Sequence, residues 1–159
     1  MNLIYSGQYK PIIGKSVFLA GCSPRKGQIL NWRKDAIDIL LKWNHNGEQD
    51  IETIIIPEPE TGESSDYNSV INWEITYMNY SDYVLFWVPR SISNQIYGFT
   101  TNIEFGKCIG LNKPFVYGRP DDSDNNRYLD AVYEIHTGSK PSNTLDDLIY
   151  DLYDDLIWK

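Results

Sequence analysis

Glu104 is the residue whose type and position best suit chemistry in this sequence. It lies between two apolar residues in the first turn of a helix that we predict over residues 101–110. A buried strand, residues 83–88, precedes this helix and ends at Pro89. Ligands of open α/β sheets bind in the crevice beyond the carboxyl ends of the strands, so a carboxylate here would face a ligand. The alternative is an ordinary first-turn acid favoured by the helix dipole.

The other reactive residue types form no recognisable site. Cys22 precedes Ser23, but neither histidine is near it in sequence and no partner base is visible. The two cysteines and two histidines have no spacing typical of zinc ligands. We therefore expect no metal site and no cofactor.

Strands alternate with helices along most of the chain, which predicts a mostly parallel sheet covered on both faces. We expect strands at residues 16–20, 50–56, 83–88, 114–117 and 134–136, after a short edge strand or hairpin arm within residues 1–14. Helices are expected at residues 31–43, from Asp66 or Ser69 onward, at 101–110 and at 126–133, and over a last segment capped by Thr144 and Asp147. An apolar stripe including Ala36, Leu40, Leu41 and Trp43 should bury the helix over residues 31–43.

Length and charge restrict the class of protein. The 159 residues suit a single domain spanning the chain, with residues 1–14 as an N-terminal arm. With 22 acidic and 14 basic residues, the net charge of −8 would repel polymeric nucleic acid. No apolar run approaches the roughly 20 residues of a membrane span. Two cysteines are too few for a disulfide framework. We expect a cytoplasmic protein that binds neither membrane nor nucleic acid.

Four phrases, taken in order, resemble the nucleoside 2-deoxyribosyltransferase-like family, most closely its small bacterial and phage branch. They are Val17-Phe18-Leu19-Ala20-Gly21 with Ser23-Pro24-Arg25 and Trp32-Arg33; Pro57-Glu58-Pro59; Trp73-Glu74 with Asp82; and Phe86-Trp87-Val88-Pro89-Arg90 leading to Thr100-Thr101-Asn102-Ile103-Glu104-Phe105-Gly106. The resemblance implies a flavodoxin-like or Rossmann-like three-layer α/β fold with a five-stranded sheet. It also implies a homodimer or higher homo-oligomer.

The resemblance further implies an enzyme that exchanges or hydrolyses the N-glycosidic bond of a nucleoside, nucleotide or related metabolite. Family enzymes use a glutamate nucleophile separated by one residue from a following glycine, which matches Glu104 and Gly106. Glu74 takes the place of a family aspartate eight residues before Asp82, and would protonate or polarise the departing base. A helix-surface acid is the alternative for Glu74. Asp82, at the start of a strand, is expected to be structural.

Candidate substrate-binding residues surround these two acids. Ser23 and Arg25, after Gly21, resemble the phosphate-binding turn of the family's nucleotide hydrolases, and a hydroxyl with a guanidinium suits such an anion; Arg25 is otherwise a solvated loop cation. Thr101 and Asn102 could orient Glu104 or the sugar. The aromatic candidates for the pocket wall or a lid are Trp73, Trp87 and Tyr97. The two tryptophans also lie in patterns typical of a core, and Tyr97 could be a plain loop aromatic.

One departure from the family leaves two functions open. Transferases carry a further aspartate six residues before the nucleophile, where this chain has Gly98, and its loop over residues 91–99 is longer. The first hypothesis is an N-glycosidic-bond enzyme. The second is a non-catalytic nucleotide-binding module, such as a sensor or sponge.

Overall fold

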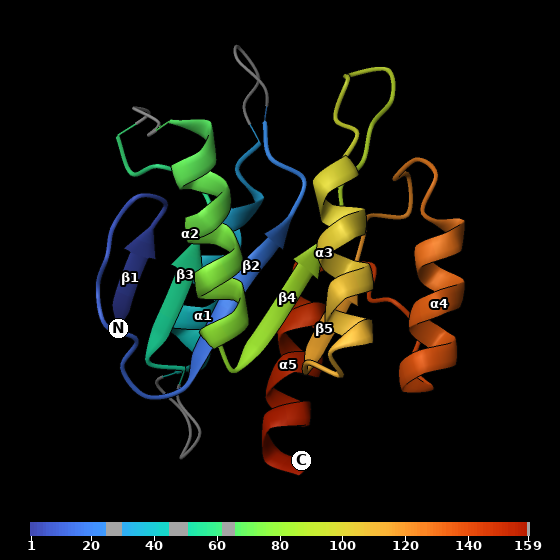
Figure 1. Cartoon of the computed structure of the whole chain (residues 1–159). Helices are drawn as coiled ribbons and strands as arrows, with labels where there is room; N and C mark the ends of the chain where they lie inside the picture. Colours follow the sequence, from blue (N-terminus) through green and yellow to red (C-terminus); the bar gives the residue numbers. More distant parts are fainter. Residues whose placement is uncertain (25–29, 45–50, 62–65, 159) are drawn as a thin grey trace.

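One parallel sheet of five strands organises the molecule (Figure 1). The computed structural model describes residues 1–24, 30–44, 51–61 and 66–158. The strands, with their bounds, are β1 Asn2–Tyr5, β2 Ser16–Gly21, β3 Thr53–Ile56, β4 Tyr83–Trp87 and β5 Phe115–Gly118. Their order across the sheet is β1-β3-β2-β4-β5, and every pair is parallel. The expected α/β architecture with a mostly parallel five-stranded sheet is therefore confirmed.

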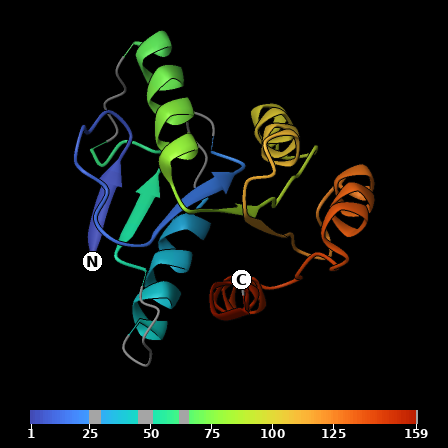
Figure 2. The ribbon, with the colours of Figure 1, turned by 60° about the horizontal axis from the view of Figure 1, so that its bottom comes forward.

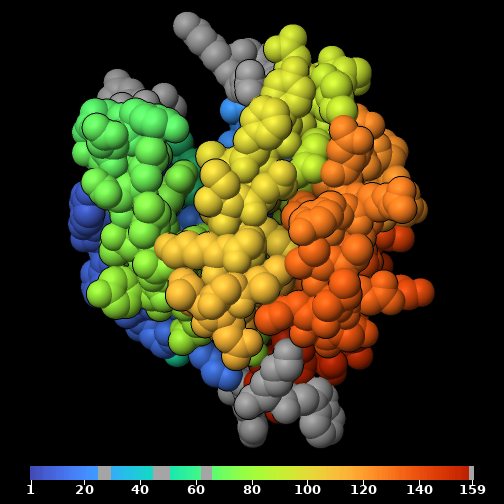
Figure 3. Space-filling model, turned by 45° about the vertical axis from the view of Figure 1, so that its right-hand side comes forward, coloured from blue at the N-terminus to red at the C-terminus, as the bar shows by residue number. Residues whose placement is uncertain are grey.

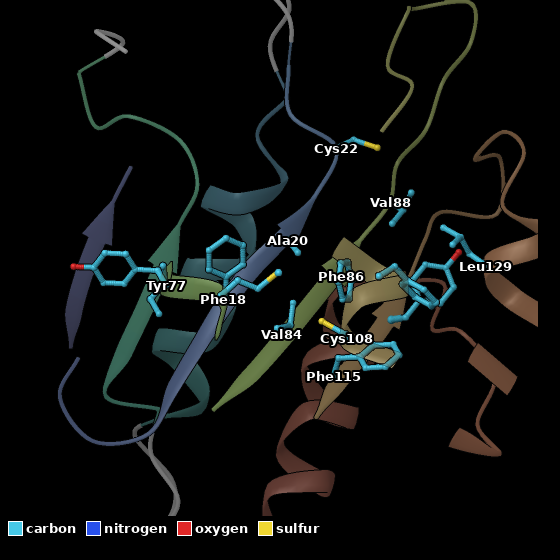
Figure 4. Close-up of a cluster of buried hydrophobic side chains, with 14 of the residues drawn as sticks. Phe18, Ala20, Cys22, Tyr77, Val84, Phe86, Val88, Cys108, Phe115 and Leu129 are labelled. Carbon is cyan, nitrogen blue, oxygen red and sulfur yellow. The ribbon is translucent and has the colours of Figure 1, made fainter. Parts of the chain in front are cut away.

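The central strands are apolar along their whole length because both faces of the sheet are covered. All residues of β2 and β4 are buried. Side chains alternate between the faces with a period of two. Phe18, Ala20, Val84 and Phe86 accordingly point into the same hydrophobic cluster (Figure 4).

The described part of the chain has five helices. They cover the two faces of the sheet, as Figure 2 shows from a second direction. Their bounds are α1 Trp32–Trp43, α2 Tyr67–Tyr80, α3 Phe99–Gly110, α4 Arg127–Thr137 and α5 Leu145–Trp158. Buried side chains of α2, α3 and α4 join one hydrophobic cluster, and those of α1 and α5 join the cluster on the other face. The result is three layers, helix on sheet on helix.

Local capping agrees with the sequence at two helix starts. The Asp66 carboxylate accepts a hydrogen bond from the Ser69 N–H at 3.1 Å, which satisfies a free donor at the start of α2. Thr144 and Asp147 form the expected box at the start of α5: the Asp147 N–H donates to Thr144 Oγ1 at 3.1 Å. Asp82 is structural, as expected, because it accepts hydrogen bonds from the Ser16 N–H and hydroxyl at 2.8 and 2.6 Å.

Two expectations from the sequence are wrong, one about a strand and one about the apolar face of α1. Residues 134–136 are not a strand but the last turns of α4, where Ile135 is 85% exposed and only Leu129 and Tyr133, four residues apart, are buried. The fifth strand is instead β1, which pairs with β3 and is an edge strand rather than a hairpin arm. The apolar stripe of α1 is also narrower than expected, because Leu41 and Trp43 are each 37% exposed.

Two further boundaries move. β3 begins at Thr53 rather than residue 50. α3 begins at Phe99, so Glu104 lies in its second turn and not its first. Within the described ranges, no helix combines the length and apolar character needed to cross a membrane.

Candidate active site

From β2 the chain continues to β3 on one side of the sheet, and β4 then lies on the other side of β2, so the strand order reverses between β2 and β4. These two strands are parallel neighbours, and their carboxyl ends are therefore adjacent. Gly21, the last residue of β2, is in register with Trp87 of β4. Its φ of +144° and a Cβ position only 2.0 Å from the Trp87 carbonyl oxygen leave no room for a side chain. The strand ends therefore approach closely here, at the place where open α/β sheets bind ligands.

The surface is hollowed between α2 and α3 above these strand ends (Figure 3). A cavity of about 200 Å³ lies at the start of α3. We call it the α3 hollow; it is lined by Ser23, Tyr97, Gly98, Phe99, Thr100 and Thr101. Three of them, Ser23, Tyr97 and Thr101, were predicted from the sequence to bind the substrate. A fourth, Gly98, is the position where family transferases carry an aspartate.

Glu74 of α2 and Glu104 of α3 are both half-buried, and they lie close enough for the charge of Glu74 to act on Glu104. Burial, together with the negative charge of Glu74, raises the pKa of Glu104 to about 7. Burial also raises the pKa of Glu74. The charge of Glu74 therefore favours the protonated form of Glu104.

Arg33 supplies the positive charge opposite the two acids. It comes from the first turn of α1 and is buried, with 3% of its surface exposed. Its Nε donates to the Leu19 carbonyl at 3.0 Å and its Nη2 to the Gly21 carbonyl at 3.1 Å, so it is fixed on the carboxyl end of β2. Its charge lowers the pKa of Glu104 and of Glu74, which favours their ionised forms.

Glu58 completes this cluster from the third strand. It follows β3 and pairs with Arg33 Nη1. Arg33 also lies over the Trp32 ring, with 4.4 Å between the guanidinium carbon and the ring centroid. Arg33 therefore links the ends of β2 and β3 to the start of α1.

A second buried cation, Arg90, lies behind the start of α3. Its Nη1 donates to the Asn125 carbonyl and its Nη2 to Asn102 Oδ1, both at 2.7 Å. The candidate Asn102 is thus held by Arg90. The candidate Thr101 is fully buried, and none of the described residues forms a hydrogen bond with its Oγ1.

The aromatic candidates are divided between core and pocket. Trp73 is 1% exposed and donates from Nε1 to the Gln8 carbonyl at 2.7 Å. Trp87 is buried in the cluster beneath α1 and α5. Only Tyr97 lines the α3 hollow, where its ring stacks on Phe99 at 5.3 Å between centroids. Arg25 lies outside the described residues.

Sequence reasoning assigned no role to Arg33, Glu58 and Arg90, although all three stood in the quoted phrases. Two features of the sequence could have indicated Arg33 and Glu58. Arg33 occupies the buried side of an amphipathic helix, where an arginine needs partners. Glu58 follows directly after a strand end, at the edge of the sheet where ligands bind.

Some chemistry can be set aside at this site. Burial raises the pKa of the Cys22 thiol to about 11, so it stays protonated near neutral pH and is a poor nucleophile. Among the described residues, no group of three His, Cys, Asp or Glu side chains is placed to hold a metal ion. What the site does offer is two carboxyl groups whose pKa values are raised by burial, under the influence of a fixed guanidinium.

Comparison with known proteins identifies the family. The model of the family described as nucleoside 2-deoxyribosyltransferase like matches residues 14–121. This segment contains Glu74, Glu104 and Arg33, and the four phrases noted in the sequence. A search of curated proteins found no match. The chain belongs to the nucleoside 2-deoxyribosyltransferase-like family.

Proposed function

We propose that this protein cleaves or exchanges the N-glycosidic bond of a nucleoside, deoxynucleoside, nucleotide or related metabolite, with Glu104 as the nucleophile. The observation that carries the proposal is that Glu74 and Glu104 both feel the charge of Arg33, which is fixed on the carboxyl end of β2, where the strand order of the sheet reverses. An ordinary dipole-favoured acid is a weaker explanation for Glu104, because it lies beyond the first turn of α3.

The two acids divide the work in the proposed reaction. In the reactive form of the pair the proton lies on Glu74 and Glu104 is ionised, although burial and the charge of Glu74 favour a protonated Glu104. The ionised Glu104 attacks C1′ of the sugar, and an ester bond to the carboxylate forms as the bond from C1′ to the base nitrogen breaks. The electron pair of that bond stays with the base, which takes the proton of Glu74. Water or a second base then attacks C1′, releases the Glu104 carboxylate and returns a proton to Glu74.

Arg33 tunes this pair. A nucleophile must be ionised, whereas burial and the charge of Glu74 favour a protonated Glu104. The fixed guanidinium of Arg33 opposes both effects, since its positive charge favours the carboxylate. The site thereby holds Glu104 near the midpoint of its titration at neutral pH, where a proton moves at little cost.

The remaining candidates would hold the substrate. Ser23, Tyr97 and Thr101 line the α3 hollow, and Gly21 lets β2 and β4 close beneath it. Asn102 is placed next to Thr101 by Arg90, and Arg25 is proposed as a further contact in the loop after β2. Trp73 and Trp87 support the walls from the core.

We also propose that the protein works in the cytoplasm as a homodimer or higher homo-oligomer, without polymeric nucleic acid. Two features support this. Phe99 and Ile103, on the outer side of α3 beside the hollow, are 69% and 73% exposed, which suits a face covered by a second copy. Cys22 and Cys108 are free thiols, as in a reducing compartment.

Product analysis tests the enzymatic proposal. The protein is incubated with nucleosides, deoxynucleosides, their 5′-phosphates and dinucleotide cofactors, with and without an acceptor base. Free or exchanged base should form with wild type and with Glu134→Gln, a matched loss of an exposed acid on α4. Glu104→Gln should reduce the rate at least a hundredfold, because a carboxamide is a poor nucleophile. Full activity of Glu104→Gln would contradict the assigned role.

The second candidate function is a non-catalytic nucleotide-binding module. The observation that favours it is Gly98, where family transferases have an acid. Thermal shift with the same panel separates the two functions. A rise in Tm with a ligand that yields no product would support binding alone.

A further inference from the structure

Glu74 and Glu104 are half-buried carboxyl groups that have no partner among the described residues. Neither forms an ion pair or a hydrogen bond with that part of the chain, and their pKa values respond to burial and to the charges of neighbours alone. Carboxylates that are removed from water are normally paired, because their desolvation is otherwise uncompensated. The lack of a partner at both acids therefore calls for an explanation.

Arg33 acts on both acids through its charge, but its hydrogen bonds go elsewhere. Its Nε and Nη2 donate to the carbonyls of Leu19 and Gly21. Its Nη1 donates to the Cys22 carbonyl at 3.4 Å and pairs with the Glu58 carboxylate. Because that carboxylate offsets the charge of the guanidinium, Arg33 offers the two acids a weakened charge and no hydrogen bond.

The other groups that act on Glu104 do not supply a counter-charge either. Lys107, three residues further along α3, lowers the pKa of Glu104 but forms no ion pair with it. The thiols of Cys22 and Cys108 interact with Glu104, and burial raises the pKa of both to about 11, so they are neutral near pH 7. With the neutralised Arg33 set aside, two carboxyl groups stand against one lysine in the described part of the chain.

A cation that arrives from outside would compensate this excess of acid. A metal ion does not suit the site, since no three His, Cys, Asp or Glu side chains of the described segments are grouped to hold one. An organic cation with a delocalised charge costs less to remove from water than a compact ammonium, which suits half-buried acids. In the proposed reaction the group that meets Glu74 is the base, so the base would carry this charge.

We propose that this site takes N-glycosides whose base carries a positive charge, such as a pyridinium or an N-alkylated purine or pyrimidine. The inference rests on the proposed function and names its substrate class. The helices α2 and α3, which carry Glu74 and Glu104, flank the hollow in Figure 3. A cationic ring bound there supplies the counter-charge that both acids lack.

A cationic base also removes the need for a proton on Glu74. A neutral base must take that proton while Glu104 is ionised, although burial and the charge of Glu74 favour a proton on Glu104. With a cationic base both acids can be ionised. Glu104 attacks C1′, the bond from C1′ to the ring nitrogen breaks, and its electron pair neutralises the ring. Water then attacks C1′, passes its proton to Glu74 and releases the Glu104 carboxylate.

Pairs of ligands that differ in the charge of the base test the inference. Nicotinamide riboside is compared with its reduced, neutral form, 1-methyladenosine with adenosine, and 3-methylcytidine with cytidine, each with and without a 5′-phosphate. Calorimetric titration at pH 7.5 uses Glu104→Gln, which should bind these compounds without cleaving them. In the pairs that bind, the cationic member should bind about tenfold tighter or more. Equal affinities, tighter binding of the neutral members, or no binding of any cationic member would overturn the proposal.

Double variants show whether Glu74 causes the preference. Glu74→Gln combined with Glu104→Gln should abolish the difference between the cationic and the neutral member of each pair. Glu134→Gln combined with Glu104→Gln removes an exposed acid of α4 instead and should keep the difference. A preference that persists without Glu74 would come from the net charge of −8 on the whole chain, and the proposal would fail.

A probe that cannot react tests the pairing of charges in wild type. 1-Methylnicotinamide is cationic and has no glycosidic bond, and nicotinamide is its neutral counterpart. ¹³C NMR follows the titration of the Glu104 carboxyl carbon in the presence of each. 1-Methylnicotinamide should lower the pKa of Glu104 below its value of about 7, because a nearby positive charge favours the carboxylate, and nicotinamide should not. The same titration with both compounds would contradict the proposal.

The outcomes separate this inference from the proposed function. If wild type releases base from neutral nucleosides while Glu104→Gln shows no preference for cationic members, cleavage of the N-glycosidic bond stands and selection by charge falls. If cationic members bind tighter through Glu74 but wild type forms no product from any compound, the site binds such cations and the assigned reaction falls.

Discussion

At the scale of the residue, the protonation of Glu104 depends on its neighbours more than on its own place in the helix. It lies past the first turn of α3, where the helix dipole has little effect. Burial and Glu74 favour the neutral acid, and Arg33 favours the carboxylate. Both effects leave measurable traces in the folded protein, whether or not a substrate is known.

Glu104→Gln should change stability in a pH-dependent way. The pKa of Glu104 is about 7 in the folded protein against an ordinary 4.5, so the folded state holds a proton that the unfolded state releases between these values. Glu104 therefore costs stability progressively from pH 4.5 to 7, and fully above pH 7. Urea denaturation should find Glu104→Gln more stable by roughly 1–3 kcal/mol at pH 8 and unchanged at pH 4. The exposed Glu134→Gln should show no such difference, and an equal change at both pH values would contradict this reasoning.

Glu74→Gln should lower the pKa of Glu104. The negative charge of Glu74 raises that pKa, so a neutral amide of the same shape removes the repulsion. The carboxyl carbon of Glu104, followed by NMR in protein labelled with ¹³C-glutamate, should titrate near pH 7 in wild type and at lower pH in the variant. An unchanged titration would mean that the two acids do not interact, and would remove the main support for a catalytic pair.

At the scale of the element, the site depends on how α1 is fastened to the sheet. Arg33 crosses from the start of α1 to the carbonyls of Leu19 and Gly21, and it pairs with Glu58 after β3. One side chain thus fixes the ends of two strands and places a positive charge near both catalytic candidates.

Arg33→Gln should destabilise the fold strongly. The shorter amide cannot reach the strand carbonyls and leaves Glu58 without its partner, and breaking a buried pair costs about 3–5 kcal/mol. Arg119→Gln is the control, because Arg119 also pairs with an acid, Asp130, but its side chain is 21% exposed against 3% for Arg33, so its loss should cost about 1 kcal/mol or less. Urea denaturation of both variants measures the difference. Similar losses in the free energy of unfolding of the two variants would mean that Arg33 does not hold α1 on the sheet as described.

At the scale of the whole molecule, local sequence patterns predicted the elements that carry the site. The features that they did not predict depend on contacts between residues far apart in the sequence. Apolar runs and the proline that follows one of them predicted the strand before Pro89 and the helix with Glu104. Because ligands of open α/β sheets bind beyond the carboxyl ends of the strands, Glu104 was also expected at that end of the sheet. The edge strand β1 was left uncertain because its pairing with β3 joins residues 51 positions apart, such as Asn2 and Thr53. The roles of Arg33 and Arg90 were missed because their partners come from other elements. Such contacts exist only after folding.

The N-terminal arm has a further consequence for the site. After β1 the chain passes along α2, where the Gln8 carbonyl accepts from Trp73 Nε1 at 2.7 Å and the Lys10 carbonyl accepts from the Tyr77 hydroxyl at 2.8 Å. Glu74 is the residue after Trp73, so these two bonds fix the helix that carries it. The arm at one edge of the sheet thereby positions the helix that carries a catalytic candidate.

Trp73→Phe combined with Tyr77→Phe tests this coupling, because both rings remain while both donors are lost. Each hydrogen bond contributes about 0.5–1.5 kcal/mol, and the smaller ring at position 73 adds a cavity cost. Hydrogen exchange should accelerate in α2 and in residues 2–10. It should not accelerate in α4, because neither of the two hydrogen bonds involves that helix. Tyr128→Phe, on the exposed side of α4, should leave exchange unchanged. Uniform acceleration over the whole chain would mean that the two bonds support global stability alone; acceleration confined to α2 and the arm would tie the position of Glu74 to the first ten residues.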